Sequence, residues 1–181
     1  YKGVYIYAQL VDNVLTGISF ELLGKARDLA KDLNTDVTAV LVGSDVKDLC
    51  GPLAQYGADK VIVVDDPELK EYRTEPYTHA LASVINAFKP EIMLVGATAI
   101  GRDLGPRVSA RVATGLTADC TVLEIGDFPL NPMPNQEQKH NQLLMTRPAF
   151  GGNTIATIAC PDNRPQMATV RPGVMQKIAP I

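Results

Sequence analysis

The chain alternates between short, nearly continuous apolar runs and longer stretches whose apolar residues recur every three or four positions. The runs predict buried β-strands, and the periodic stretches predict amphipathic helices. Strands are expected at 3–8, 36–42, 60–64, 91–95 and 120–125, and helices at 19–34, 46–56, 75–88 and within 95–119. Strands that alternate with helices through short turns specify an α/β fold with a parallel sheet, and their apolar character indicates helices on both faces.

Local signals set the expected helix boundaries. Ser19 stands where an N-cap is needed and Asn34 stands near the first C-cap. Gly57 is the expected stop of the second helix, and Lys89-Pro90 ends the third. The third helix is expected to bury one apolar face, formed by Tyr77, Leu81, Val84, Ile85 and Phe88.

The pattern changes after Ile125. Residues 127–141 contain three prolines and many polar side chains, which predicts a loop or a projecting arm. The runs 142–147, 154–159 and 167–171 are short and β-like, and turn residues separate them. We expect late strands here, some of them antiparallel, followed by an exit into a linker near residue 175.

The 181 residues suffice for one ordinary domain, and the net charge of -3 gives no electrostatic support for nucleic-acid binding. No apolar run approaches the roughly 20 residues that span a bilayer. Cys50, Cys120 and Cys160 are odd in number and widely spaced, which favours reduced thiols in the cytoplasm over disulfides or a metal site. The chain begins at Tyr1 rather than at a methionine, so we expect a piece of something longer.

The stretch 95–119 joins an apolar strand directly to a helix through Gly96-Ala97-Thr98 and Gly101. Free N–H groups at such a helix start suit a phosphate or a carboxylate. Alternatively, the two glycines only permit a tight turn and close packing, with Thr98 or Asp103 capping the helix. The spacing alone does not choose between these alternatives.

Common catalytic constellations are missing from the sequence, so no catalytic residue and no metal site is assigned. His79 is expected on a helix surface and His140 in the polar loop, and neither has a nucleophile in a recognisable frame. Asp65-Asp66 is more consistent with a solvated strand end than with a cation site. Cys120 is expected in the core, because no basic residue flanks it in the sequence.

A second informative stretch is Thr146-Arg147-Pro148-Ala149-Phe150-Gly151-Gly152-Asn153. Two adjacent glycines allow the backbone to approach a flat group closely, and Arg147 offers a fixed positive charge with a planar set of donors. Such an arginine beside a reduced aromatic ring would stabilise negative charge. It is equally consistent with a structural ion pair above a simple hairpin.

Three segments together carry a resemblance to a known family: GVYIYAQL (3–10), VGATAIGRDLGPRVSARVATGLTADCTVLEI (95–125) and LLMTRPAFGGNTIATIACPDNRPQMATVRPGVM (143–175). The chain resembles the N-terminal domain of the α subunit of electron transfer flavoproteins. The TRPAFGGN form is similar to the branch associated with flavin-based electron bifurcation.

The resemblance implies a Rossmann-like fold of the adenine-nucleotide-hydrolase type that pairs with a β subunit. It implies a domain over 1–175, a linker from 176 to 181, and a C-terminal FAD domain that this chain lacks. FAD is then expected only in the assembled heterodimer, where Arg147, Phe150, Gly151 and Gly152 would face the cofactor. Residues 96–102 and 114–119 would pack on the β subunit instead of binding phosphate.

The function implied is electron transfer between NADH or an acyl-CoA dehydrogenase and an acceptor. We expect no nucleic acid and no membrane span, and the isolated domain could self-associate through an exposed interface. An alternative is a stand-alone nucleotide-binding regulator of the universal-stress type, although Val112-Ala113-Thr114-Gly115-Leu116 does not match its phosphate loop. The third hypothesis is a purely structural interaction domain.

Overall fold

The computed structural model describes residues 1–149 and 154–181, and its centre is a parallel β-sheet. The strands lie in the order β5-β4-β1-β6-β11-β7, and neighbouring strands pair in parallel. Their bounds are β1 (Val4–Ala8), β4 (Val37–Gly43), β5 (Lys60–Asp65), β6 (Ile92–Gly96), β7 (Leu116–Cys120) and β11 (Gln166–Val170). The α/β fold with a parallel sheet is therefore confirmed.

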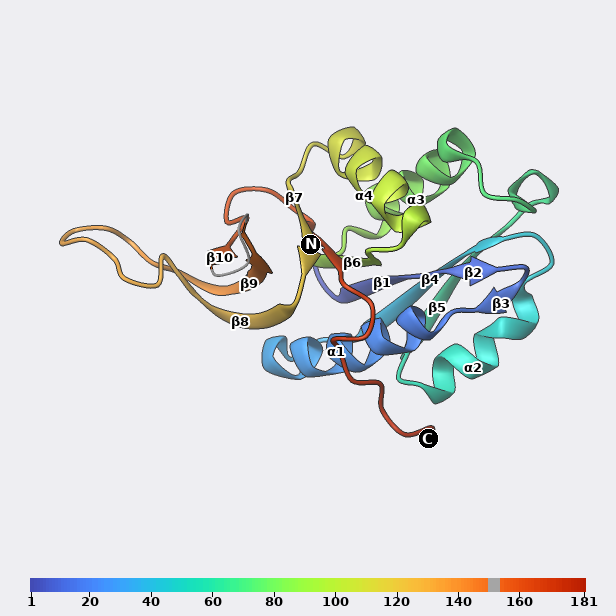
Figure 1. The fold of residues 1–181 in the computed structure, drawn as a ribbon, viewed down its shortest axis with the longest axis horizontal. Helices are drawn as coiled ribbons and strands as arrows, with labels where there is room; N and C mark the ends of the chain where they lie inside the picture. The colour runs from blue at the N-terminus through green and yellow to red at the C-terminus, as the bar shows by residue number, and fades with distance from the viewer. Residues whose placement is uncertain (150–153) are drawn as a thin grey trace.

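Helices cover both faces of this sheet (Figure 1). The face with α1 (Gly17–Leu33) and α2 (Cys50–Gln55) holds one apolar core, and a 3-10 turn, η1 (Lys47–Leu49), leads into α2. The opposite face, with α3 (Thr74–Phe88) and α4 (Ala99–Arg111), holds the second core. A short 3-10 turn, η2 (Pro67–Leu69), connects β5 to α3. Strands buried on both faces explain the continuous apolar runs.

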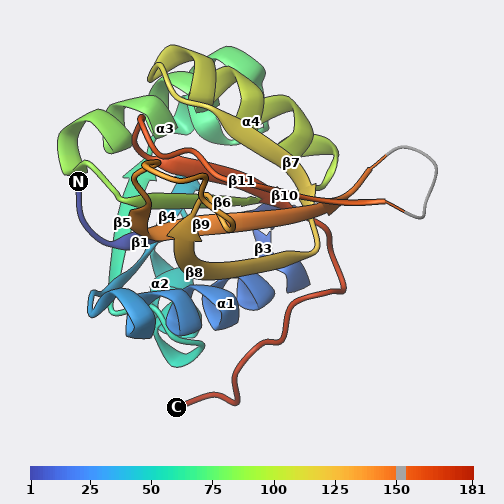
Figure 2. The same ribbon diagram turned by 90° about the vertical axis from the view of Figure 1, so that its left-hand side faces the viewer.

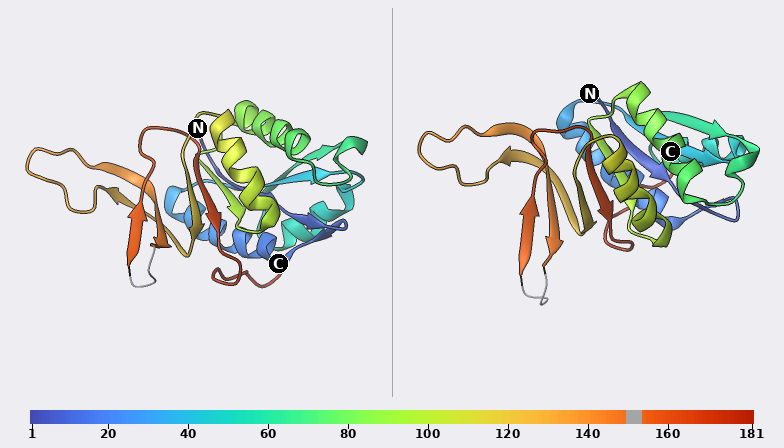
Figure 3. Two further views of the ribbon diagram at one scale, coloured as in Figure 1. Left: turned by 45° about the horizontal axis from the view of Figure 1, so that its top comes forward. Right: turned by 90° about the horizontal axis from the view of Figure 1, so that it is seen from above.

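A smaller antiparallel sheet projects from this three-layer body (Figure 3). It contains β8 (Val122–Phe128), β9 (Lys139–Pro148) and β10 (Ile155–Ile158), with β9 in the middle. The expected loop at 127–141 is shorter than predicted, because both of its ends continue the strands and only 129–138 connect them. Figure 3 shows this connection reaching away from the body as an arm.

Four details differ from the sequence prediction. The expected strand 120–125 is two strands: Cys120 ends β7 in the parallel sheet, whereas Val122 begins β8 in the antiparallel one. Thr16, not Ser19, is the N-cap of α1. Phe88 was predicted on the buried face of α3, but it is 54 % exposed at the last turn. His140 lies in β9 and not in the loop.

A two-stranded hairpin, β2 (Leu10–Val11) and β3 (Val14–Leu15), follows β1 and was not predicted. Its turn residues Asp12 and Asn13 both have positive φ, the conformation that a two-residue hairpin turn requires. The hairpin therefore redirects the chain between the end of β1 and the start of α1.

The C-terminal segment runs back along α1 (Figure 2). Met175 is buried in the α1-side core, and the backbone N–H of Gly173 donates to the Glu21 carboxylate at 2.8 Å. A side chain at Gly24 would collide with the carbonyl oxygen of Gln176, which shows how closely this segment and the helix approach.

The turn at 96–101 is packed shut. A Cβ on Gly96 would stand 2.7 Å from the Ile18 side chain, and one on Gly101 would stand 1.7 Å from the Gly96 carbonyl oxygen. Thr98 is the N-cap of α4, and its hydroxyl accepts from the Gly101 N–H at 3.1 Å while donating to Gln9 Oε1 at 2.6 Å. Of the two interpretations of this turn, close packing is the one that the structure supports.

We predict that Gly101→Ala lowers the free energy of unfolding by about 3 kcal/mol, because the new methyl group must displace the backbone of β6. Chemical denaturation measures the change. Gly51→Ala is the matched control: it lies in α2 with nothing within 4 Å of the added Cβ, and it should be neutral or slightly stabilising. Equal losses in both variants would contradict the packing account of Gly101.

Candidate functional site

Arg147 lies near the end of the central strand β9, opposite Ala156 of β10. Side chains alternate along a strand, so Arg147 shares a face with Leu143 and Met145, which are fully buried against the body of the domain. The last paired residue of β8 on this side is Val122, opposite Thr146. Arg147 is therefore the first residue of β9 beyond its pairing with β8, and its side chain is half-buried.

Asp119 lies in β7 next to the buried Cys120, and three arginines act on its carboxylate, one of them by direct contact. Arg171 holds this carboxylate through two hydrogen bonds, Nε to Oδ1 at 3.1 Å and Nη2 to Oδ2 at 2.7 Å. These bonds hold the pKa of Asp119 below its usual range, and the charges of Arg171, Arg147 and Arg102 act in the same direction. We call Arg102, Arg147, Arg171 and Asp119 the arginine cluster.

The arginine cluster carries more positive than negative charge, with three guanidinium groups against one carboxylate. Within residues 1–149 and 154–181, the guanidinium of Arg147 makes no hydrogen bond or ion pair, whereas its backbone pairs with Ala156. A half-buried guanidinium with unused planar donors fits an electron-rich ring or a phosphate group. The cluster is therefore chemically suited to an anionic or electron-rich ligand.

Phe150, Gly151 and Gly152, the other three predicted cofactor-facing residues, lie outside the described residues. The described strands β9 and β10 bring the two ends of that stretch together, with Ala149 N–H donating to the Thr154 carbonyl at 2.7 Å. The structure thus places Arg147 at the loop end of the β9–β10 hairpin, one residue before β9 ends.

The other candidate residues named from the sequence have positions or contacts that a structural role explains. Cys120 is fully buried, and this burial raises the pKa of its thiol to about 12, although the charge of Arg147 acts against the shift. Asp65 accepts hydrogen bonds from the N–H groups of Asp45 and Val46, and Asp66 accepts one from Glu68. His79 is exposed on α3, as predicted.

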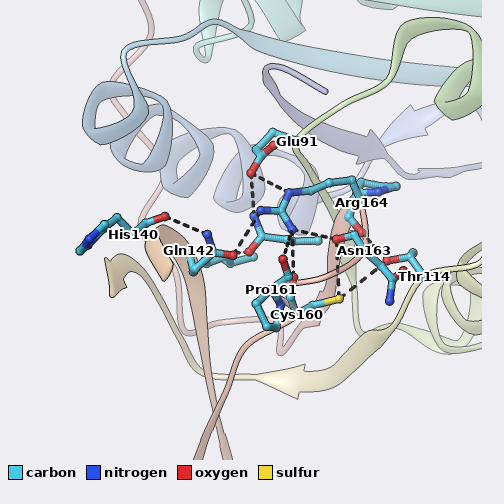
Figure 4. Close-up of polar contacts among 11 residues, drawn as sticks. Glu91, Thr114, His140, Gln142, Cys160, Pro161, Asn163 and Arg164 are labelled. Carbon is cyan, nitrogen blue, oxygen red and sulfur yellow. Dashed lines mark hydrogen bonds and ion pairs between the residues drawn. The ribbon is translucent and has the colours of Figure 1, made fainter. Parts of the chain in front are cut away.

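Arg164 clamps the small sheet to the large one, and sequence reasoning missed it (Figure 4). Its Nε donates to Glu91 Oε1 at 2.9 Å, just before β6, and its Nη2 donates to Gln142 Oε1 at 3.2 Å on β9. Its Nη1 donates to the carbonyls of Cys160 and Asn163 at 3.0 and 2.9 Å. No local signal reveals this role, because Glu91 is 73 residues away in the sequence.

Gln166 completes the clamp at the start of β11. Its Nε2 donates to Glu91 Oε1 at 3.1 Å, and its Oε1 accepts from the Leu143 N–H at 2.9 Å. Glu91 therefore bonds to two residues that both also contact β9. The clamp fixes where β9 leaves the body and, through β9, where Arg147 lies.

Apolar side chains lie exposed on the small sheet and its arm. Ile155 is 72 % exposed and Met133 is 75 % exposed, and Val122 and Leu130 are also largely open. Apolar groups gathered on a projecting sheet mark an interaction surface.

A family model described as "Electron transfer flavoprotein domain" matches residues 4–181. The chain belongs to the electron transfer flavoprotein domain family. It is 48 % identical over 178 residues to the electron transfer flavoprotein subunit alpha of Clostridium acetobutylicum, covering 98 % of this chain and 50 % of that protein. It is 50 % identical over 178 residues to Protein FixB of Clostridium saccharobutylicum, with the same shares.

A third relative is subunit LctC of the lactate dehydrogenase (NAD(+),ferredoxin) of Acetobacterium woodii, 43 % identical over 171 residues, or 94 % of this chain and 38 % of that protein. The chain spans about half the length of the curated electron transfer flavoprotein relatives it matches. In the part of the chain that the structure describes, no helix has the length and apolar content needed to cross a membrane.

We predict that Arg164→Ala lowers the free energy of unfolding by about 2–3 kcal/mol, since it leaves Glu91 and several carbonyls without their donor. Denaturant unfolding measures this loss. Hydrogen exchange should also show faster opening of β9 than of β1. Arg107→Ala is the control, because Arg107 makes one ion pair at 3.6 Å and is 62 % exposed; a loss as large as that of Arg164→Ala would refute the clamp.

Proposed function

We propose that this chain is the N-terminal domain of an electron transfer flavoprotein α subunit, which presents Arg147 to an FAD held largely by a β subunit. The family assignment supports this proposal, and so do the relatives named as α subunits over 98 % of this chain. The observation that carries it is the position of Arg147: half-buried, in a cluster with excess positive charge, near the end of β9 and directly before a stretch with two glycines.

A flavin supplies the redox chemistry when it is bound, accepting and releasing one or two electrons. Arg147 would donate hydrogen bonds to the electron-rich edge of the ring and place a fixed positive charge beside it. That charge stabilises the reduced ring relative to the oxidised ring, and so raises the reduction potential. In our proposal Phe150, Gly151 and Gly152 line the same edge, with the glycines leaving room for the ring.

The exposed apolar surface of the small sheet supports a partner subunit. We assign Val122, Ile155 and the arm at 129–138 to the contact with the β subunit. The family resemblance also assigns residues 96–102 and 114–119 to this contact, and we keep that assignment in the proposal. Gly96 and Gly101 pack inside the domain, whereas the side chain of Arg102 is exposed and available to a partner.

The wider role we propose is electron transfer between NADH or an acyl-CoA dehydrogenase and a second acceptor, in the cytoplasm, where free thiols are usual. LctC is named as a subunit of a lactate dehydrogenase of NAD(+) and ferredoxin, and this name supports two acceptors and hence electron bifurcation as the finer proposal.

We propose a domain over 1–175, a linker from 176, and an FAD domain beyond it. A stand-alone nucleotide regulator is disfavoured, because residues 112–116 do not match its phosphate loop and the helix start at 96–101 is packed shut.

Replacing Arg147 by Ala should lower the reduction potential of the flavin in the heterodimer by about 50 mV, because a positive charge beside the reduced ring is lost. Arg147→Lys should lower it less, since the charge stays while the planar donors go. Spectroelectrochemical titration of the flavin absorbance measures both. Arg27→Ala is the control, because it removes an arginine of α1 that is paired with Asp59. An identical shift of the reduction potential in this variant would contradict a local role for Arg147.

Ile155→Glu should weaken association with the β subunit at least about tenfold, because it places a charge in an apolar contact. Sedimentation or surface plasmon resonance measures the dissociation constant. Val14→Glu is the matched control, because Val14 is 64 % exposed on the β2–β3 hairpin, outside the small sheet. If both variants bind the partner equally well, the small sheet is not the interface.

A further inference from the structure

A cavity of about 550 Å³ opens at the carboxyl edge of the parallel sheet, separate from the arginine cluster. It is lined by Tyr7 near the end of β1 and Val42 near the end of β4. Leu10 on the β2–β3 hairpin and Ile100 at the start of α4 add apolar side chains to the lining. Tyr72 and Tyr77 form an aromatic wall, with ring centroids 5.0 Å apart. The sheet order reverses at β1, and ligands of open α/β sheets bind beside such a point.

The Tyr7 hydroxyl is the feature that marks this cavity as a binding site. Tyr7 is only 2 % exposed, yet its hydroxyl has no hydrogen-bond partner among residues 1–149 and 154–181. Tyr72 instead donates to Asp103 at 2.6 Å, and Tyr77 donates to the Leu69 carbonyl. In the described chain no fully enclosed side-chain nitrogen or oxygen lacks a partner, so the Tyr7 hydroxyl must reach the open space of the cavity that Tyr7 lines.

Burial raises the pKa of Tyr7 far above its ordinary value, so the phenol stays protonated and can both donate and accept. A buried polar group of this kind is normally paired, and a bound polar atom would supply the missing partner. The apolar and aromatic walls around it suit a flat ring.

Polar groups stand at the rim of the cavity. Asp12, Asn13, Lys70 and Glu71 line it, so two carboxylates face one ammonium group. Carboxylates and an amide recognise sugar hydroxyls, and their excess negative charge repels phosphates. The hairpin that carries Asp12 and Asn13 is held in place by Asn13 Nδ2, which donates to the Ser44 carbonyl at 3.3 Å.

We propose that this cavity binds a nucleoside, with the base against the aromatic wall of Tyr72 and Tyr77 and hydrogen-bonded to the Tyr7 hydroxyl, and the sugar hydroxyls at the Asp12 and Glu71 carboxylates. The neighbouring start of α4 offers no phosphate site, because the Gly101 N–H is already bonded to Thr98 and the turn is packed shut. The affinity therefore belongs to the nucleoside portion and falls as phosphates are added.

The test is equilibrium dialysis of radiolabelled adenosine and guanosine, and of AMP and ATP, against the full-length protein in complex with its partner subunit. We expect a dissociation constant near 100 μM for at least one nucleoside, weakened about tenfold by Tyr7→Phe. Tyr5→Phe is the matched control, because it removes the same hydroxyl from the same strand and the same core but outside the cavity. The flavin absorbance of each variant reports separately on the arginine cluster.

Nucleoside binding that Tyr7→Phe weakens and Tyr5→Phe leaves unchanged supports the proposal. It is overturned if neither nucleoside binds at concentrations up to about 5 mM, if Tyr7→Phe has no effect, or if ATP binds more tightly than adenosine.

Discussion

The bond between Arg164 and Glu91 is the constraint on which the arrangement of the two sheets depends. Glu91 precedes β6 in the large sheet, and Arg164 precedes β11, which enters that sheet between β6 and β7. The same guanidinium reaches Gln142 on β9, so one side chain fixes three segments that are distant in the sequence. Both partners of the ion pair are only about one-fifth exposed, which makes the loss of either one costly.

From this clamp follows the position of Arg147. Leu143 and Met145 anchor the next part of β9 in the α1-side core, and Arg147 is the following residue on the same face. A rigid strand thus carries a charged side chain from the buried core to the edge of the domain. Placing the functional group on a strand fixed at its base is a general route to a well-oriented electrostatic contact.

Local chemistry predicted the elements well, whereas long-range contacts decided what could not be predicted. Asn34 ends α1 in the left-handed conformation and Gly57 follows α2 with positive φ, both as expected from capping rules. The run 120–125 was predicted as one strand, but Cys120 pairs with Val170 in the large sheet whereas Val122 pairs with Thr146 in the small one. The β2–β3 hairpin was not predicted, although the Asp12-Asn13 pair is typical of a two-residue hairpin turn.

The candidate site was only partly predictable for the same reason. Arg147 could be singled out by its residue type and its neighbouring glycines. The rest of the arginine cluster, however, comes from segments up to 69 positions apart in the sequence: Asp119, Arg171 and Arg102. The insertion of β11 between β6 and β7 brings them together, and no periodicity in the run 166–170 distinguishes that position from an edge. The resemblance to a family supplied a role for Arg147 that spacing alone left open.

The most direct test of the central claim is a crystal or cryo-EM structure of the full-length protein with its β subunit and bound flavin. Our account predicts the Arg147 guanidinium within hydrogen-bond distance, about 3 Å, of the flavin ring, with the small sheet against the β subunit. A structure in which Arg147 faces solvent, or in which the flavin lies remote from the arginine cluster, would contradict it.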